Sequence, residues 1–156
     1  MEAFKFSLSR VRNYKSQVLD KEKKTLAALQ RQRSEIQDRI NVLEAYRARK
    51  AAEIVEKQKK GATMVELMQS NFLIENARTQ ITAAREELKK MEAAVEAQRK
   101  VVLSIYQEKT GMDKLEEKQV EEYRVLEAKA AENEIMQVIS NKLASSGGDE
   151  STVGIA

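Results

Sequence analysis

Between Ser7 and Leu143 the chain contains no proline and only two glycines, Gly61 and Gly111. Proline and glycine are the residues that most strongly interrupt helices, so only the two glycines favour a turn in this stretch. Ala, Glu, Lys, Leu and Arg make up about half of the chain, as is typical of long helices and coiled coils. Only 4% of the residues are aromatic, which argues against a compact core of the usual kind. The sequence therefore predicts an all-α fold made of long helices.

Signals for the end of one helix and the start of another surround Gly61. Lys59 and Lys60 suit the negative end of a helix dipole, and Gly61 suits the left-handed position that often follows a helix. Thr63 and Glu66 have the spacing of a capping box, in which the two residues satisfy each other's backbone N–H groups. These signals predict a tight hairpin turn between two helices.

The remaining boundaries follow from the same reasoning. Gly111 has no capping residues beside it, so it is expected inside a helix, where glycine costs about 1 kcal/mol relative to alanine. The last residues are rich in Ser and Gly, which predicts disorder. The expected elements are a single elongated domain at 1–143, with helix one at about 7–59, the turn at 60–63 and helix two at about 64–143, and a disordered tail at 144–156.

Apolar residues recur in both expected helices with the heptad spacing of a coiled coil. In helix two the spacing selects Ile74, Ala77, Ile81, Ala84, Leu88, Met91, Val95, Gln98, Val102, Ile105, Lys109 and Met112. In helix one it selects Leu19, Leu26, Leu29, Ile36, Ile40, Leu43 and Ile54, together with the polar residues Glu22, Arg33, Arg47 and Lys50. A short turn makes the helices antiparallel, so the numbers of facing residues add up to about 124. We therefore expect an antiparallel coiled coil in which helix two extends past helix one.

The two halves of the chain carry opposite net charges. Residues 1–60 have a net charge of +8 and residues 61–156 a net charge of −5, which together give the +3 of the whole chain. Opposite charges favour the pairing of the two helices, although each exposed ion pair contributes only a few tenths of a kcal/mol. The positive net charge is better explained by this pairing than by a nucleic-acid-binding surface. The nucleic-acid alternative predicts binding that weakens steeply with salt.

Composition removes several classes of function. The chain has no Cys and no His, which excludes zinc fingers, thiol nucleophiles and Ser-His-Asp triads. Adjacent carboxylates such as Glu86 and Glu87 point about 100° apart on a helix, which is typical of a solvated face. We expect no enzymatic activity, no cofactor and no metal site. No apolar run is long enough for a signal peptide or a membrane span, so a soluble, cytosolic protein is expected.

Two surfaces are candidates for binding partners. Near the turn, Val65, Met68 and Phe72 fall on the face of helix two opposite the heptad positions, next to Leu73, and exposed apolar stripes often mark partner sites. The alternative is a shift of register near the turn that buries this stripe. At the open end, apolar residues near the N-terminus meet the stretch 120–126 of helix two, next to the part of helix two that extends past helix one. Self-association through this end is the alternative. The residues of this second surface are Phe4, Phe6, Leu8, Val11, the stretch 120–126, Ile135, Val138, Ile139 and Leu143.

The N-terminal motif Phe4-Lys-Phe6-Ser-Leu8-Ser-Arg-Val11-Arg-Asn-Tyr14-Lys resembles the opening of the flagellar export chaperones of the FliJ family. The resemblance extends over about residues 4–143 and includes the mid-chain hairpin glycine and the late segment Glu117-Lys-Gln-Val-Glu-Glu-Tyr-Arg124. Arg12 stands where the family usually has Leu, which bears on the packing of the first helical turn.

This resemblance implies a fold like the central stalk of rotary ATPases and a role in flagellar type III protein export. The implied partners are the export ATPase hexamer, the cytoplasmic domain of the membrane export gate protein and the chaperones of export substrates. The implied location is the cytoplasmic face of the membrane at the flagellar base, reached through these partners. The rival interpretation is a homodimeric coiled-coil tether without a role in export.

The resemblance also implies residues for two of these contacts. In the family the gate contact lies on helix two just after the hairpin, and the matching positions are Leu73, Ala77, Gln80 and Ala84. Combined with the apolar stripe, the expected gate-binding residues are Val65, Met68, Phe72, Leu73 and Ala77. The expected residues for the ATPase ring are Phe4, Phe6, Leu8, Val11, Tyr123, Leu126, Ile135 and Ile139.

Overall fold

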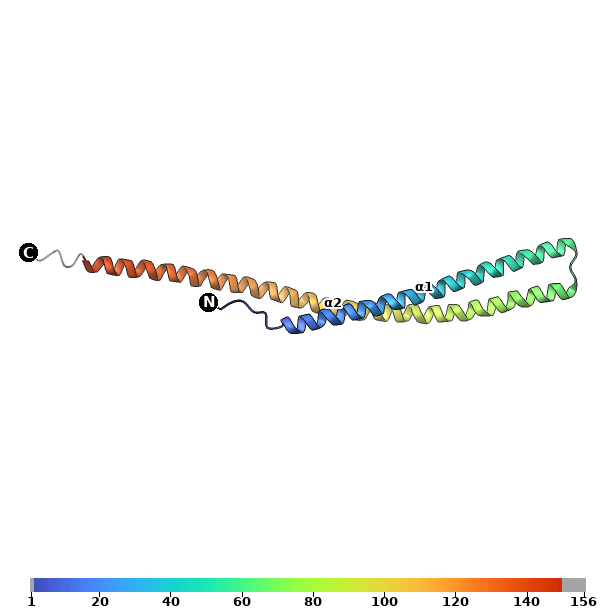
Figure 1. Cartoon of the computed structure of the whole chain (residues 1–156), viewed down its shortest axis with the longest axis horizontal. Coiled ribbons are helices and arrows are strands. Elements are labelled where there is room, and N and C mark those ends of the chain that lie inside the picture. The colour runs from blue at the N-terminus through green and yellow to red at the C-terminus, as the bar shows by residue number, and fades with distance from the viewer. Residues whose placement is uncertain (1, 150–156) are drawn as a thin grey trace, which may run out of the picture. The chain divides into compact units, whose positions relative to one another are not determined.

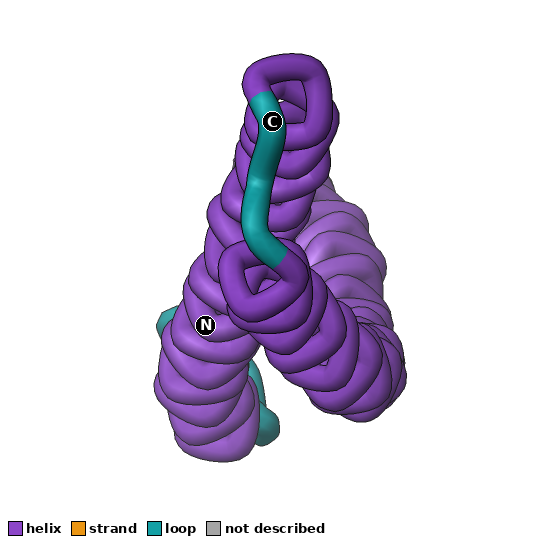
Figure 2. Tube along the Cα trace, turned by 90° about the vertical axis from the view of Figure 1, so that its right-hand side faces the viewer, coloured by secondary structure: helices purple, strands orange, loops and turns teal. Residues whose placement is uncertain are grey.

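The computed structural model describes residues 2–149, which form two long α-helices and short loops. Helix α1 spans Ser9–Lys60 and helix α2 spans Met64–Asp149, and the two pack against each other as a hairpin (Figure 1). Figure 2 shows helix and loop but no strand in this described part of the chain. The predicted all-α, two-helix fold is confirmed.

The helix boundaries differ from the expected ones at both ends of the chain. Helix α1 begins at Ser9, because the backbone N–H of Ser9 donates to the carbonyl of Phe6 (3.2 Å) and forms a turn before the helix. Helix α2 continues past Leu143 to Asp149. The Ser145 hydroxyl donates to the carbonyl of Lys142 (3.0 Å), so this serine supports the helical backbone. The rest of the expected tail, residues 150–156, lies outside the described residues.

The hairpin turn has the geometry that its residues predict. Gly61 has a φ of 85°, a left-handed conformation in which a side chain is strained. The backbone N–H of Glu66 donates to the Thr63 hydroxyl, and the N–H of Thr63 donates to the Glu66 carboxylate, both over 3.3 Å. This reciprocal pair is a capping box, and it starts α2 immediately after the turn.

Contacts divide the chain into two compact units, which are described separately: Ser16–Tyr106, and Met1–Lys15 with Gln107–Ala156. In the unit Ser16–Tyr106, the core is a seam along the facing sides of α1 and α2. Ile36, Ile40 and Ala84 form a buried cluster, against which Leu88 and Met91 pack. That Ile36 and Ile40 of α1 cluster with Ala84 and Leu88 of α2 agrees with the predicted register, in which the numbers of facing residues add up to about 124.

The seam continues in both directions along the same unit. In α2 its buried residues have the expected heptad spacing, and they are Ala77, Ile81, Ala84 and Val95. In α1 one predicted seam position is wrong, because Arg47 is exposed and Tyr46 is half-buried in its place. The aromatic side chain covers more apolar surface than the guanidinium, which is better solvated. Arg49 and Lys50 then lie over the Tyr46 ring, at 6.0 and 5.6 Å from its centroid.

In the other unit, the extended segment before α1 packs against α2. Phe6 is 7% exposed, and the Phe4 and Tyr123 rings lie 5.7 Å apart. The Tyr123 hydroxyl donates to the Glu2 carbonyl (2.5 Å), which ties the N-terminal segment to α2. The Arg12 guanidinium lies 5.4 Å from the Phe6 ring centroid and also pairs with Glu116. Arginine at this position therefore contributes both a cation–π contact and an ion pair.

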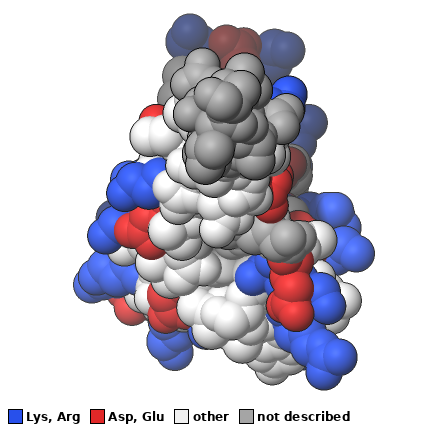
Figure 3. Space-filling view, turned by 90° about the vertical axis from the view of Figure 1, so that its left-hand side faces the viewer, with Lys and Arg blue, Asp and Glu red and all other residues white. Residues whose placement is uncertain are grey.

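Ion pairs between the helices follow the charge difference between the halves of the chain. Among the described residues, four of the five such contacts place the cation on α1 and the carboxylate on α2. These four are Arg12–Asp113, Arg12–Glu116, Lys15–Glu108 and Arg39–Glu87, and the reverse pair is Arg85–Glu44. On the face shown in Figure 3, basic and acidic side chains are interspersed. Three cations of α1, Arg12, Lys15 and Arg39, are thus paired with carboxylates of α2.

Candidate functional site

The apolar stripe near the turn is exposed. Val65 and Met68 are exposed, and Phe72 has 70% of its surface open to solvent. Ser70 is buried and Leu67 is half-buried on the opposite side of the same helix, so the heptad register continues unbroken to the turn. The alternative of a register shift that buries the stripe is therefore wrong. We refer to Val65, Met68 and Phe72, together with the adjoining Leu73, as the tip stripe.

The tip stripe contains a shallow apolar depression. It is lined by Met68, Gln69, Phe72 and Leu73, which project from consecutive turns of α2. The capping box at Thr63 and Glu66 fixes the start of this helix, so the stripe lies on regular helical backbone from its first residue. An exposed methionine and phenylalanine beside a depression suit the burial of an apolar side chain from another protein.

The positions implied by the resemblance divide into two groups. Leu73 and Gln80 are exposed, whereas Ala77 and Ala84 are 3% and 4% exposed and belong to the seam. Ala84 packs with Ile36 and Ile40 of α1. A partner on the surface of α2 can therefore contact Leu73 and Gln80 directly, while Ala77 and Ala84 hold α1 in place.

Heptad counting missed two residues of α1 that lie close to this surface. Val42 and Tyr46 line an open groove between the helices, opposite Leu73 and Ala77. Val42 is 68% exposed although it is apolar. Val42 could have been noticed in the sequence because it is an apolar residue next to the seam residue Leu43. In the structure it lines the groove between the two helices.

At the open end, the predicted residues separate by burial. Phe6 is buried, and Phe4, Leu8 and Tyr123 are half-buried within the packing of the N-terminal segment on α2. Val11 is 43% exposed, so its contact with α2 stays a prediction. These aromatic residues hold the N-terminal segment against α2, so most of their surface is used inside the chain.

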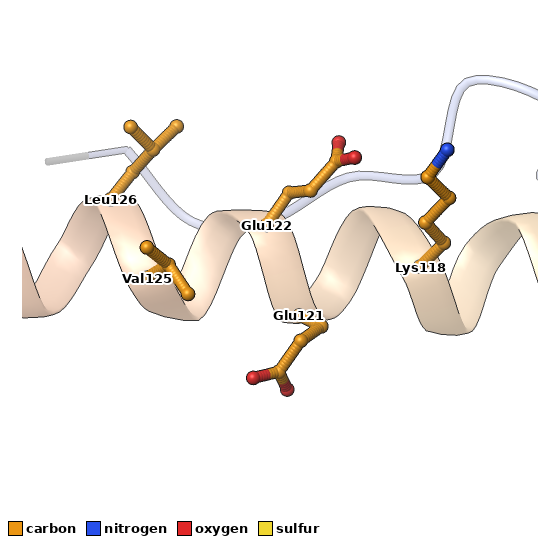
Figure 4. Close-up of a pocket in the computed structure, with 5 residues that line it drawn as sticks. All are labelled: Lys118, Glu121, Glu122, Val125 and Leu126. Carbon is orange, nitrogen blue, oxygen red and sulfur yellow. The ribbon is translucent and has the colours of Figure 1, made fainter.

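Past this contact, α2 exposes a second set of apolar residues. Leu126, Ile135 and Ile139 are all at least half exposed. One depression beside them is lined by Lys118, Glu121, Glu122, Val125 and Leu126 (Figure 4). In Figure 4 Lys118, Glu122 and Leu126 project from one side of α2, and Glu121 projects from the opposite side. A second depression is lined by Ala131, Glu134, Ile135, Val138 and Ile139. We refer to Leu126, Ile135 and Ile139 as the distal stripe.

The sequence of this helical hairpin was compared with models of known protein families. Residues 4–135 match the model of the flagellar FliJ protein family. The chain belongs to the FliJ family. Comparisons with curated proteins and with solved structures found no match.

Membership of the FliJ family makes this chain a component of flagellar type III export, and members of the family act without catalysis. It also implies association with the export apparatus at the flagellar base. The matched region contains the whole tip stripe and the N-terminal motif, and it ends at Ile135 within the distal stripe.

The described residues contain no cluster of acidic side chains that could hold a metal ion. Neither α1 nor the described length of α2 includes a segment apolar enough to cross a membrane. The exposed apolar surfaces described above are the tip stripe and the distal stripe.

Proposed function

We propose that this FliJ-family protein links the export ATPase ring to the membrane export gate. In this proposal the tip stripe binds the cytoplasmic domain of the gate protein, and the open end with the distal stripe enters the ATPase ring. The protein also escorts the chaperones of export substrates. It works in the cytoplasm and reaches the membrane at the flagellar base only through its partners.

The exposure of the tip stripe carries this proposal. Val65, Met68 and Phe72 are apolar, occupy one face of a capped helix and are each more than 60% exposed. Large exposed apolar side chains on a regular helix are costly to leave in water and are typical of partner surfaces. Family membership supplies the class of partner, because the chain is a component of flagellar export.

The test is the affinity of the full chain for the purified cytoplasmic domain of the gate protein, measured by calorimetry. Phe72→Ala is expected to weaken binding by about 2 kcal/mol, or roughly 30-fold in Kd, because a buried aromatic residue in an interface often contributes this much. Tyr106→Ala is the matched control, since Tyr106 is an exposed aromatic residue of the same unit, away from the turn.

Helical circular dichroism should be the same for both variants and the unmodified chain, because both side chains are exposed. Equal affinities for Phe72→Ala and Tyr106→Ala would show that the tip stripe is not the gate surface. The proposal would then be wrong for this end of the molecule.

A second function is favoured by the distal stripe. Leu126, Ile135 and Ile139 are at least half exposed, and an exposed apolar helix face can pair with a second copy of itself. On this alternative the chain is a homodimeric tether. It predicts a stable dimer without any other protein, whereas the export adaptor is a monomer in the absence of its partners.

A further inference from the structure

Over the first turns of α1, the contact with α2 is ionic. In the unit Ser16–Tyr106, by contrast, buried apolar residues line the seam between the helices. The ion pairs of the other unit are Arg12–Asp113, Arg12–Glu116 and Lys15–Glu108. The Arg12 and Lys15 side chains are less than a third exposed. Charged residues thus face α2 here, where apolar residues do so elsewhere in the hairpin.

The apolar neighbours of these charged residues are more exposed than a seam requires. Val11 is 43% exposed next to Arg12, and Leu115 is 38% exposed next to Glu116. A coiled-coil seam normally has the opposite arrangement, with the apolar residues inside. Partly exposed ion pairs stabilise a protein much less than buried apolar side chains do. The first turns of α1 are therefore held to α2 more weakly than the later turns.

The segment before α1 is held mainly by three apolar side chains. Phe6 is buried and Phe4 and Leu8 are half-buried, whereas the residues between them are exposed. Alternate residues of an extended segment point to the same side, and on this side Phe4 meets Tyr123 of α2. Within residues 2–149, one hydrogen bond joins this segment to α2, from the Tyr123 hydroxyl to the Glu2 carbonyl. Few bonds therefore have to break for the segment to leave α2.

Opposite net charges hold the start of the chain against α2. Residues 2–15 carry four basic side chains and one acidic side chain, which gives a net charge of +3. Residues 107–127 of α2 carry a net charge of −3. Salt screens the attraction between exposed charges, whereas apolar packing does not depend on that attraction. The contact of residues 2–15 with α2 should therefore be more sensitive to salt than the apolar seam.

We propose that residues 2–15 form a detachable arm, which leaves α2 as one piece while the hairpin of the unit Ser16–Tyr106 stays paired. The end of the arm follows from the contacts on either side of it. The last ionic contact of the arm with α2 is at Lys15, and the next turn of α1 contains Leu19, which is 3% exposed. The two compact units also divide α1 between Lys15 and Ser16.

Release of the arm changes the surface that α2 offers to a partner. Tyr123 is half-buried and lies against Phe4 of the arm, whereas Leu126 is exposed. Residues three apart are neighbours on the surface of a helix, so release extends the apolar surface from Leu126 back to Tyr123. The arm is thus an autoinhibitory contact, because it competes with any partner that needs this longer surface.

Thiol labelling of the full chain tests the arm without a partner, because the chain has no Cys. Val120→Cys places a thiol on the half-buried face of α2, one turn before Tyr123. Its labelling by an uncharged reagent should become about fivefold faster between about 0.01 M and about 0.5 M NaCl, because salt weakens the ion pairs of the arm. Leu126→Cys, at an exposed position, corrects for effects of salt on the reagent.

Removal of the paired cations should act like salt. In the Val120→Cys chain, Arg12→Gln with Lys15→Gln should make labelling at low salt about fivefold faster. Lys5→Gln with Arg10→Gln is the matched control and should leave the rate unchanged. It removes the same charge from the arm, but both residues are exposed, and neither has an ion pair among the described residues. Equal helical circular dichroism would show that the variants are folded.

Val95→Cys reports whether the rest of the hairpin opens, since Val95 is 2% exposed in the unit Ser16–Tyr106. Its labelling should stay slow at both salt concentrations. If it accelerates together with that of Val120→Cys, the whole hairpin opens, and the inference of a separate arm is wrong. The inference is also wrong if the Val120→Cys rate does not respond to salt, or if the control pair of substitutions accelerates it as much as Arg12→Gln with Lys15→Gln.

Discussion

Gln98 and Glu22 are polar residues at seam positions, and they meet each other across the helices. The Gln98 amide donates to the Glu22 backbone carbonyl over 3.1 Å and also to the Glu22 carboxylate. Both side chains are half-buried and have lost part of their hydrogen bonding to water, so each would lack a hydrogen-bond partner if the other were absent. A polar pair inside a mainly apolar seam favours the register in which its two members meet, at some cost in stability. At the scale of the residue, this pair is therefore a register-setting contact.

Removing one member of this pair should cost more than removing both. Gln98→Leu is expected to destabilise the chain by about 1–2 kcal/mol, because the Glu22 carboxylate loses its partner in a half-buried place. The double variant Glu22→Leu with Gln98→Leu should recover this loss, since two apolar residues then meet. Thermal unfolding followed by circular dichroism measures both effects.

The chain has no Cys, so a cysteine pair introduced at Ile36 and Leu88 reports the native register by disulfide formation. The double variant should form this disulfide less completely than the unmodified background. If the double variant is less stable than Gln98→Leu alone, the pair stabilises the fold outright and does not act mainly on register.

At the scale of the element, the two mid-chain glycines have opposite roles. Gly61 adopts a φ of 85° at the turn, whereas Gly111 lies inside α2 with no such conformation. An added Cβ would meet no atom within 4 Å at either glycine. The difference between them is therefore one of backbone conformation and not of available space.

The same substitution should consequently have opposite signs at these two positions. Gly61→Ala is expected to destabilise the chain by about 1 kcal/mol or more, because alanine is strained at positive φ. Gly111→Ala should stabilise it by about 1 kcal/mol, because alanine is the better helix former. Thermal unfolding by circular dichroism measures both variants, and two shifts of the same sign would contradict this assignment.

Most of the element structure could be predicted from local sequence, because local chemistry determines it. The turn at Gly61 and the capping box at Thr63 depend on neighbours in sequence, and the seam of α2 depends on a regular apolar period. Tyr46 and Arg47 are adjacent and both fit the period of α1 closely, so only packing against α2 decides which one is covered.

Other features escaped prediction for related reasons. The aromatic contact of Phe4 with Tyr123 involves the extended segment before α1, whose backbone the sequence does not determine. The Ser/Gly composition after Leu143 predicted disorder, but the hydroxyl of Ser145 donates to a helical carbonyl and α2 continues. The tip stripe could be predicted because its residues fall outside the heptad positions of the seam. The groove could not, because it is lined by residues of both helices, and the sequence does not give the rotation of one helix relative to the other.

At the scale of the whole molecule, the two main features are the opposite net charges of the two halves of the chain and the two exposed apolar stripes. Cations of α1 pair with carboxylates of α2. The apolar residues of the two stripes, by contrast, remain exposed to solvent. The tip stripe belongs to the unit Ser16–Tyr106 and the distal stripe to the other unit. Two partners can therefore bind the same chain through different units.

On the proposed function, a chain that ends after Tyr123 should fail to stimulate the export ATPase and should still bind the gate protein. The truncation removes the distal stripe but retains the Phe4–Tyr123 contact and the hairpin. Stimulation of ATP hydrolysis by the purified ATPase is the measurement. The matched full-length control is Ile135→Asp with Ile139→Asp, which should show the same loss.

Full stimulation by the truncated chain would contradict a role of the distal stripe in the ATPase ring. Sedimentation of the unmodified chain at micromolar concentration distinguishes the adaptor from the homodimeric tether. A monomer is expected, and a stable dimer that Ile135→Asp dissociates would favour the tether.

Ala77 lies in the seam and at the base of the groove at the same time. The other surface residues, such as Phe72 and Val42, are exposed, so they can change without loss of the hairpin. Binding specificity can therefore diverge along the flanks while the coiled coil stays intact. Ala77 is the exception, because a larger residue there would fill the groove and also push the helices apart. Among related chains, this position should vary less than the partner-binding residues around it.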